Sequence, residues 1–516
     1  MKSIMRTKFN VSHISFSMIF TTSLYVICNA VNLDKITKWF YLGDSIDYIG
    51  LISFLTVGLC LFMAVFILFA HRWTIKPLAI IFIILSATVT YFISKYNVAI
   101  DTSMVMNSLY TDVTEIRGLL SVHMFPYIVF LIILPSLVII NVNITFQSAA
   151  KYLSTSLIVC ALAIIIGVVL VYANYKSIHR AVNISDKYII HTLVPVNYIR
   201  SIASIIQRSI ESYNRKHKNE VEISGHVTSQ HDLVVVLAIG EAARQKNFSL
   251  YGYNRKNTNP VLSEEKSLHI LNGKARIGTT YLALQEILER NDVTLPAITS
   301  KLGIDTSCYV NYTLNDNCDP VVEVHASNCG HEGQCYDEDV ITLLESNLQT
   351  YTSGYRFIVL HFGGGSHGPN YIYRFPPEFQ HFNPQCTEAD VVNHCTKEQL
   401  YNTYDNSILY VDYVVGETIK RLDHSGVPYV FIYLSDHGES LMEEGRLFHG
   451  MPPGIPLPPE QAQIPLLVKS SIPVTIVQHD EYHQQDVFDS VLDLFSVKSE
   501  ILNKERAFIK KLNDRD

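Results

Sequence analysis

Metal-binding side chains follow three apolar stretches of the chain, at the point where each stretch ends. They are Glu241 after residues 232–240, His367 after residues 355–362, and the pair Asp436 and His437 after residues 427–434, with His449 shortly beyond. Because the carboxyl ends of parallel strands meet at one edge of an open α/β sheet, we expect these side chains to lie close together. Carboxylate oxygens and imidazole nitrogens suit zinc or a related divalent ion. Glu241 alone could be a helix N-terminal carboxylate, but three successive strand ends favour a metal site.

A hydroxyl group that could attack phosphorus lies in residues 275–281, directly before a helical stretch over residues 282–290. The segment holds the hydroxyls of Thr279, Thr280 and Tyr281. A hydroxyl at a helix N-terminus lies beside backbone N–H groups that favour phosphate, and a neighbouring metal ion makes it a nucleophile. The same position also suits a threonine that only caps the helix, and spacing alone favours this simpler interpretation.

Asn107, Thr111 and Glu115 recur at every fourth residue between two apolar segments. On a helix they form one polar stripe near the membrane surface. The stripe could bind a lipid headgroup or its amine. It could equally be the solvated face of an exterior loop, and the spacing does not separate the two interpretations.

The three apolar strands alternate with helical stretches such as residues 402–422, which indicates an α/β domain. We expect this domain to cover residues 231–516. The chain has 516 residues, a net charge of −8 and no basic block. This charge pattern argues against nucleic acid as a partner.

Five stretches before residue 175 are long and apolar enough to span a bilayer, which needs about 20 residues each. They cover residues 14–33, 48–70, 77–94, 124–144 and 154–174. None contains a charged residue, which disfavours a transporter. The first is not a signal peptide, since no small-residue cleavage site follows it. Lys2, Arg6 and Lys8 place the N-terminus in the cytoplasm, so five spans in residues 1–175 would leave the α/β domain outside.

Residues 176–230 would connect the two parts. This segment has four isoleucines among polar residues, Ile202, Ile205, Ile206 and Ile210. The pattern is typical of an amphipathic helix lying on the membrane surface. A helix that simply packs on the α/β domain has the same pattern.

Six of the nine cysteines lie in polar segments as three near pairs. The pairs are Cys308 and Cys318, Cys329 and Cys335, and Cys386 and Cys395. None has the C-x-x-C spacing of a zinc ribbon. Three short disulfide loops in an oxidising compartment are the natural interpretation, with six free thiols in a cytosolic domain as the alternative.

Taken together, these motifs resemble those of the phosphoethanolamine transferases that modify lipopolysaccharide, within the alkaline phosphatase and sulfatase superfamily. The resemblance covers nearly the whole chain. It rests on residues 240–253 (GEAARQKNFSLYGY), 366–369 (SHGP), 435–440 (SDHGES), 449–452 (HGMP) and the Asn107 stripe. It implies a five-helix membrane domain and an alkaline-phosphatase-like, sulfatase-type α/β domain on the periplasmic side of the bacterial inner membrane.

The resemblance also implies roles for individual residues. Glu241, Asp436, His437 and a threonine would bind one zinc ion, while His367 and His449 would contact the transferred phosphate or a second zinc. Two of the cysteine pairs, Cys329 with Cys335 and Cys386 with Cys395, match disulfides of the family. The pairing of Cys308 with Cys318 rests on proximity alone.

One departure from the family concerns the nucleophile. Family members often carry Cys-Gly-Thr-x-Thr with the second threonine as nucleophile, whereas residues 277–281 read Ile-Gly-Thr-Thr-Tyr. Strict register places Tyr281 there, and a shift of one residue places Thr280 there. Thr280 is preferred because a threonine has the right reach and chemistry, and Thr279 remains an alternative. Residues 315–318 also lack a lysine found in several relatives.

The implied activity is transfer of phosphoethanolamine from phosphatidylethanolamine to a lipopolysaccharide acceptor, lipid A or the inner core. It would proceed through a zinc-activated threonine and a covalent phospho-enzyme. A phosphoglycerol transferase of the same superfamily is the nearest alternative, and a non-catalytic membrane sensor with a metal-stabilised domain is another. A sulfatase is disfavoured, because the sequence has no Cys-x-Pro-x-Arg segment.

Overall fold

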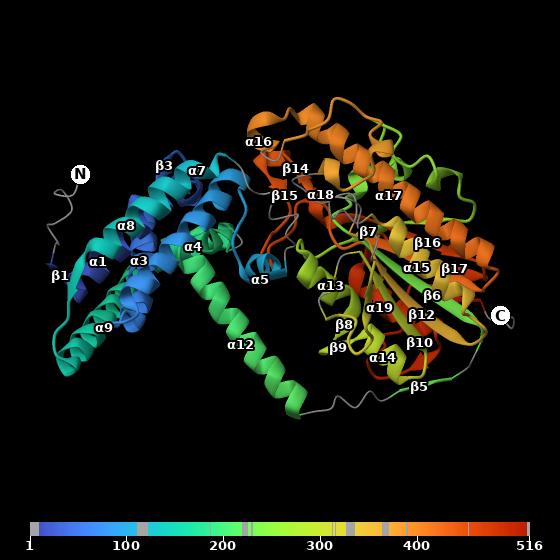
Figure 1. Cartoon of the computed structure of the whole chain (residues 1–516), viewed down its shortest axis with the longest axis horizontal. Helices are drawn as coiled ribbons and strands as arrows, with labels where there is room; N and C mark the ends of the chain where they lie inside the picture. Colours follow the sequence, from blue (N-terminus) through green and yellow to red (C-terminus); the bar gives the residue numbers. More distant parts are fainter. Residues whose placement is uncertain are drawn as a thin grey trace. The chain divides into compact units, whose positions relative to one another are not determined.

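The computed structural model describes residues 10–110, 122–185, 187–218, 225–228, 231–311, 313–314, 316–326, 336–363, 371–388, 391–452 and 454–512. The chain divides into two compact units (Figure 1). One is built from Met1–Val105 and Leu120–Ile206, and the other from Met106–Leu119 and Gln207–Asp516.

Helices make up almost all of the first unit. Four are long and apolar enough to cross a membrane: α3 (Tyr48–Phe69), α4 (Ile75–Tyr96), the continuous helix Met124–Asn141 and α9 (Ala149–Ala173). A fifth candidate is α1 (His13–Ala30) taken together with Leu33–Phe40, across a bend of 79°. Among the described residues the unit therefore offers four spans, or five if this bent pair is one span.

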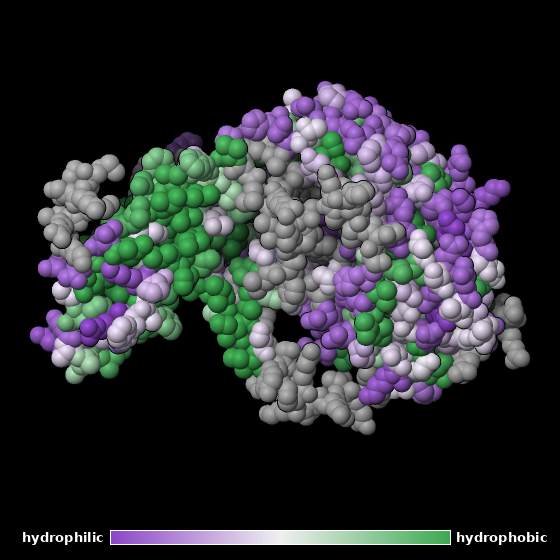
Figure 2. All heavy atoms as spheres, in the orientation of Figure 1, coloured by the Kyte–Doolittle hydropathy of each residue, from purple (hydrophilic) through white to green (hydrophobic). Residues whose placement is uncertain are grey.

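The interior of the first unit is aromatic, and its outer surface is apolar. Phe62 lies between Phe20, Phe66 and Phe82, with ring centroids 5.2–6.5 Å apart. Figure 2 shows hydrophobic residues covering much of the visible face of these helices. Such a surface is expected of a helical bundle that faces lipid.

Three further helices follow the last candidate span. They are α10 (Tyr175–Ile184), α11 (Tyr188–Thr192) and α12 (Val196–Lys218). On α12, Ile202, Ile206 and Ile210 are all exposed at spacings of four residues, so they share one side of the helix. A helix with an exposed row of isoleucines is therefore present in the connector, and its position on the membrane surface stays a prediction.

A mixed sheet of eight strands forms the centre of the second unit. Its order is β11 (Glu323–His325), β10 (Asp305–Val310), β12 (Tyr355–His361), β6 (Leu233–Gly240), β13 (Tyr429–Ser435), β16 (Gln463–Ser470), β7 (His269–Lys274) and β18 (Tyr482–His483). The strands from β11 to β13 are parallel, and β16 runs antiparallel to both of its neighbours. The predicted α/β architecture is confirmed.

Helices cover both faces of this sheet (Figure 1). One face carries α15 (Glu338–Gln349) and α17 (Lys397–Ser425), and the other carries α13 (Thr280–Leu288), α14 (Leu295–Lys301) and α19 (Gln484–Leu494). All eight residues of β6 are buried between these layers, which explains its unbroken apolar sequence.

The register of the central strands places the predicted ligands side by side. Gly240 is the partner of Ser435 in the β6–β13 pair, so Glu241 and Asp436 leave the sheet at the same edge. The ends of β6 and β12 also coincide, with Ile239 opposite His361.

Two of the predicted disulfides are present, Cys308–Cys318 and Cys386–Cys395. Cys329 and Cys335 lie outside the described residues. Cys28, Cys60 and Cys160 are free thiols in the membrane unit, as expected for packing residues.

Candidate metal centre

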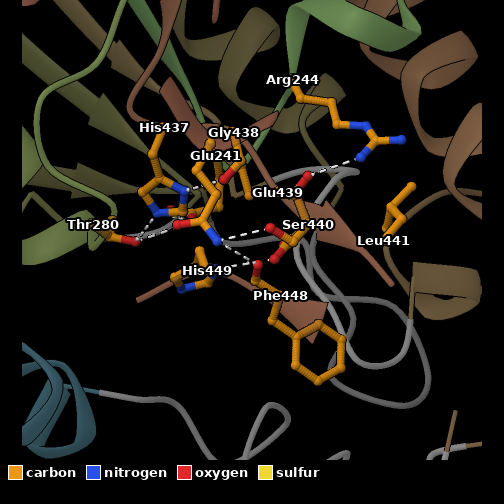
Figure 3. Close-up of polar contacts among 12 residues, drawn as sticks. Glu241, Arg244, Thr280, His437, Gly438, Glu439, Ser440, Leu441, Phe448 and His449 are labelled. Atoms are coloured by element: carbon orange, nitrogen blue, oxygen red, sulfur yellow. Dashed lines mark hydrogen bonds and ion pairs between the residues drawn. The ribbon is translucent and has the colours of Figure 1, made fainter. Parts of the chain in front are cut away.

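Three of the predicted ligands, Glu241, Asp436 and His437, meet at the carboxyl edge of the sheet. One ligand atom from each lies within 4.8 Å of the other two, and all three residues are buried. The His437 Nε2 atom is 3.2 Å from Asp436 Oδ2 and 3.5 Å from Glu241 Oε1. Figure 3 shows Glu241 and His437 converging with Thr280.

Asp436 uses its two carboxylate oxygens differently. Its Oδ1 atom accepts the backbone N–H groups of Ala242 at 2.9 Å and of His437 at 2.7 Å. Its buried Oδ2 atom has no hydrogen-bond donor among the described residues and faces the ligand cluster. Main-chain contacts therefore hold one oxygen and direct the other into the site.

The His437 ring is oriented by the main chain. Its Nδ1 atom lies 3.0 Å from the carbonyl oxygen of Gly438, so Nδ1 carries the hydrogen and Nε2 keeps its lone pair. Burial lowers the pKa of His437, which favours the neutral ring. Neutral imidazole is the form that binds a metal ion.

A cation fits these residues. The lone pair of His437 Nε2 and the carboxylate oxygen of Asp436 face each other at 3.2 Å, and two acceptors at this distance repel unless a positive charge lies between them. Two carboxylates, one imidazole and a hydroxyl are a donor set that suits zinc.

Thr280 joins this cluster as the first residue of α13. Its hydroxyl donates to Glu241 Oε1 at 3.0 Å and lies 3.3 Å from His437 Nε2. Thr279 is the N-cap residue, and its buried hydroxyl has no hydrogen-bond partner in the described part of the chain. No contact between Tyr281 and these ligands is seen among the described residues. Of the three candidates, Thr280 is therefore the one whose hydroxyl reaches the ligands.

The His449 ring packs against the His437 ring. Their ring centroids are 4.3 Å apart, and His449 Nδ1 lies 3.3 Å from Glu439 Oε1. Burial lowers the pKa of His449 to about 4, so its ring is neutral near neutral pH. Sequence reasoning missed Glu439, although its place two residues after His437 was the available signal.

The remaining predicted site residues are Asn107, Thr111, Glu115 and His367. Asn107 lies half-buried on α5 (Thr102–Tyr110). Thr111, Glu115 and His367 lie outside the described residues.

Both halves of the chain match known families. Residues 234–497 match the sulfatase family, and residues 58–210 match the family described as phosphoethanolamine transferase EptA/EptB. The fold and the site thus define a membrane-anchored enzyme of the sulfatase and alkaline phosphatase superfamily.

Individual relatives narrow this class. The chain is 32% identical over 458 residues to phosphoethanolamine transferase EptA of Helicobacter pylori, covering 82% of each chain. It is 25% identical to phosphatidylethanolamine transferase Mcr-1 of Escherichia coli, covering 94% of this chain and 95% of the relative. The structure of the integral membrane protein lipooligosaccharide phosphoethanolamine transferase A (EptA) from Neisseria meningitidis superposes with a TM-score of 0.82 at 24% identity, covering 97% of this chain and 98% of that chain.

The chain belongs to the phosphoethanolamine transferase EptA family. This membership confirms the predicted enzyme class and superfamily. It also confirms the predicted location, which is that of an integral membrane protein with its catalytic domain in the periplasm.

Proposed function

We propose that the chain transfers phosphoethanolamine from phosphatidylethanolamine to a lipopolysaccharide acceptor, at lipid A or the inner core. The observation that carries the proposal is the Thr280 hydroxyl 3.0 Å from Glu241 and 3.3 Å from His437. The name of the Mcr-1 relative supports the donor, and that of the Neisseria meningitidis protein supports a lipooligosaccharide-type acceptor.

In the first step, Thr280 Oγ1 attacks the phosphorus of phosphatidylethanolamine. A bond forms between Thr280 and phosphorus, and the bond to the diacylglycerol oxygen breaks. The proton given up by the Thr280 hydroxyl is taken up by the departing oxygen, so diacylglycerol leaves as an alcohol and phosphoethanolamine stays on Thr280 as a phosphodiester. Glu241 accepts the hydrogen bond of the attacking hydroxyl and so orients it.

Glu241, Asp436, His437 and Thr280 would hold a zinc ion. Zinc bound there would acidify the threonine hydroxyl and stabilise negative charge on the phosphoryl oxygens.

In the second step, a hydroxyl or phosphate oxygen of the acceptor attacks the same phosphorus. The bond to Thr280 breaks, and the threonine recovers its proton. Each step inverts the configuration at phosphorus, so the overall transfer retains it. His449, neutral and beside His437, would assist proton transfer, and we assign the same role or phosphate binding to His367.

The membrane unit would keep both lipids in the bilayer during the reaction. We propose that residues 1–175 form this domain, that residues 176–230 lie on the membrane surface, and that residues 231–516 form the catalytic domain. Asn107, Thr111 and Glu115 would contact the donor headgroup. Leaving the acyl chains in lipid avoids a cost of about 0.8 kcal/mol for each CH₂ group extracted.

The experiment compares Thr280→Ala with Thr279→Ala and Tyr281→Phe, using full-length protein in detergent or vesicles and phosphatidylethanolamine labelled in its headgroup. Thr280→Ala should abolish transfer while the protein still folds and binds zinc, and mass spectrometry of the wild type should find phosphoethanolamine on Thr280. Normal turnover of Thr280→Ala would refute the nucleophile. Transfer from labelled phosphatidylglycerol instead would refute the donor and favour a phosphoglycerol transferase.

Mass spectrometry of lipopolysaccharide from cells with and without the protein tests the acceptor. It should reveal an added phosphoethanolamine and its position on lipid A or the inner core. Unchanged lipopolysaccharide alongside an active enzyme would refute this class of acceptor.

A further inference from the structure

A short hairpin lies between the ligand His437 and the neighbouring His449. It consists of β14 (Ser440–Leu441), the turn at Glu443–Gly445 and β15 (Leu447–Phe448). We call residues 439–448 the site hairpin. His449 follows it directly, so the conformation of the site hairpin decides where His449 lies.

Arg244 holds the beginning of the site hairpin. Its Nη1 atom donates to the backbone carbonyl of Glu439 at 3.1 Å (Figure 3). The same atom donates to the carboxylate of Glu443 at 2.8 Å. Its Nε atom donates to Asn247 at 2.6 Å. The side chain is fully buried, and a buried guanidinium with several fixed acceptors is held in one orientation.

The surroundings of Arg244 reinforce this orientation. The guanidinium lies 5.3 Å from the ring centroids of both Tyr401 and Tyr404, which is within range of a cation–π interaction. The Tyr401 hydroxyl also donates to Glu443 at 2.7 Å. Arg244 is therefore fixed to α17, which packs on the central sheet.

Gln461 holds the end of the site hairpin. Its Nε2 atom donates to the backbone carbonyl of Phe448 at 3.1 Å and to the Ser440 hydroxyl at 2.9 Å. Gln461 is buried, and its backbone carbonyl accepts the backbone N–H of Gly438 at 2.9 Å. One residue thus contacts both strands of the hairpin and the residue that follows His437.

Phe448 shows that the end of the hairpin is held under constraint. Its φ angle is +68°, a left-handed conformation that is unfavourable for a residue with a Cβ atom. Such a conformation persists only where the surrounding contacts impose it. The hydrogen bond from Gln461 to the Phe448 carbonyl is one such contact.

We infer that Arg244 and Gln461 are positioning residues that hold the two ends of the site hairpin and thereby set His449 against His437. Neither has a described contact with Glu241, Asp436 or Thr280 side chains, so both would act through the main chain. The inference rests on the proposed function, because it assumes that His449 takes part in the transfer.

The first measurement is the steady-state rate of phosphatidylethanolamine cleavage by the full-length enzyme with its metal. Arg244→Lys should lower kcat by about 10- to 100-fold, because a misplacement near 1 Å costs a rate of this order. KM should stay within about twofold and the metal content near wild type, whereas the melting temperature should fall, because Lys cannot replace the fixed hydrogen bonds of the guanidinium. Gln461→Met removes only the amide and should act in the same direction.

Arg255→Lys is the matched control. Arg255 also pairs with a buried carboxylate, Asp405 at 2.5 Å, and lies 5.8 Å from the same Tyr401 ring. It has no described contact with the site hairpin. Its variant should keep kcat, whatever it does to stability.

A double-mutant cycle with His449→Gln decides whether Arg244 acts through His449. In the His449→Gln background, Arg244→Lys should change kcat by less than about twofold, because coupled residues are not additive. If the kcat loss of the double variant equals the product of the two single losses, the inference is overturned. A wild-type kcat for His449→Gln would also overturn it. Metal loss by Arg244→Lys in proportion to its activity would also overturn it.

The proposed function can be rejected independently of the inference about Arg244 and Gln461. Cleavage of phosphatidylethanolamine can be measured whichever residue is the nucleophile, whereas mass spectrometry of Thr280 tests the phospho-enzyme directly. An unmodified Thr280 beside a positive cycle would reject the nucleophile and keep the positioning residues.

Discussion

The side-chain amide of Asn29 pairs with the main chain of Val194 inside the membrane unit. It accepts the N–H of Val194 at 3.0 Å and donates to the carbonyl of Val194 at 2.5 Å. Both residues are buried. This pair joins the end of α1 to the segment that leads directly into α12.

Replacing Asn29 with Leu should destabilise the membrane unit. The two main-chain groups of Val194 would lose these partners in an apolar interior, at about 1–3 kcal/mol for each unsatisfied group. Thermal unfolding of the purified protein in detergent measures the loss. Asn141→Leu is the control, because that exposed amide donates to the Leu137 carbonyl of its own helix and has no hydrogen bond to another element among the described residues. Equal melting temperatures for the two variants would contradict the importance of the Asn29 pair.

Removing the metal should abolish transfer and lower stability. Without a cation, Asp436 Oδ2 and the His437 Nε2 lone pair face each other at 3.2 Å. A bound metal stabilises the fold by about 3–4 kcal/mol when it is present at roughly 100 to 1,000 times its dissociation constant. Chelation followed by zinc titration should restore both activity and melting temperature. An Asp436→Asn variant should melt at nearly the same temperature with and without chelator, and a large chelator effect there would place the metal elsewhere.

Gly438→Ala should disrupt the site. A Cβ atom at Gly438 would lie 2.2 Å from the backbone oxygen of Glu460 and 3.0 Å from Arg244 Cβ. Overpacking against main chain costs typically about 1–3 kcal/mol, and the shift would displace His437, so bound metal should fall with stability. Gly426→Ala serves for comparison: its φ is +69° but its Cβ would meet open space, so it should lose stability and keep its metal. Full metal occupancy in Gly438→Ala would show that the segment can move without harm.

Asp337 should make the catalytic domain less stable as pH rises. Burial raises its pKa to about 7, above the ordinary 3.8, so the folded state binds the proton more tightly than the unfolded state does. The stabilisation is therefore complete below about pH 4 and is lost as pH rises through 7, by at most about 1.4 kcal/mol per pH unit.

Asp337→Asn tests this dependence. The amide keeps an oxygen that can accept from Asn311 and from the Gly363 N–H, and it stays neutral at every pH. The melting temperature of the variant relative to wild type should rise between pH 5 and pH 8. If the difference in melting temperature between Asp337→Asn and wild type is the same at every pH, the Asp337 carboxyl is not the source of the pH dependence.

Sequence patterns predicted the strands of the site well, because those strands are apolar along their whole length. The runs 232–240, 355–362 and 427–434 correspond to β6, β12 and β13. The antiparallel direction of β16 could not be predicted, since its apolar sequence suits a parallel or an antiparallel strand. The bend of 79° after α1 was also missed, because hydropathy does not depend on helix direction.

The choice of Thr280 as the proposed nucleophile, and the contacts of the residues around it, needed the structure. Thr279, Thr280 and Tyr281 are adjacent in sequence, and only the start of α13 at Thr280 decides which hydroxyl faces Glu241. Arg244 contacts Glu439 across 195 residues of sequence. No local pattern reveals such a pairing.

The pairing of β6 with β13 determines when the metal centre can form during biosynthesis. Ala242 and Asp436 are 194 residues apart in sequence and meet only when these strands pair. A chain still emerging from the translocation channel thus exposes Glu241 long before its fellow ligands arrive. A metal ion held by both Glu241 and Asp436 would consequently be bound only after these two strands have paired, outside the cytoplasm.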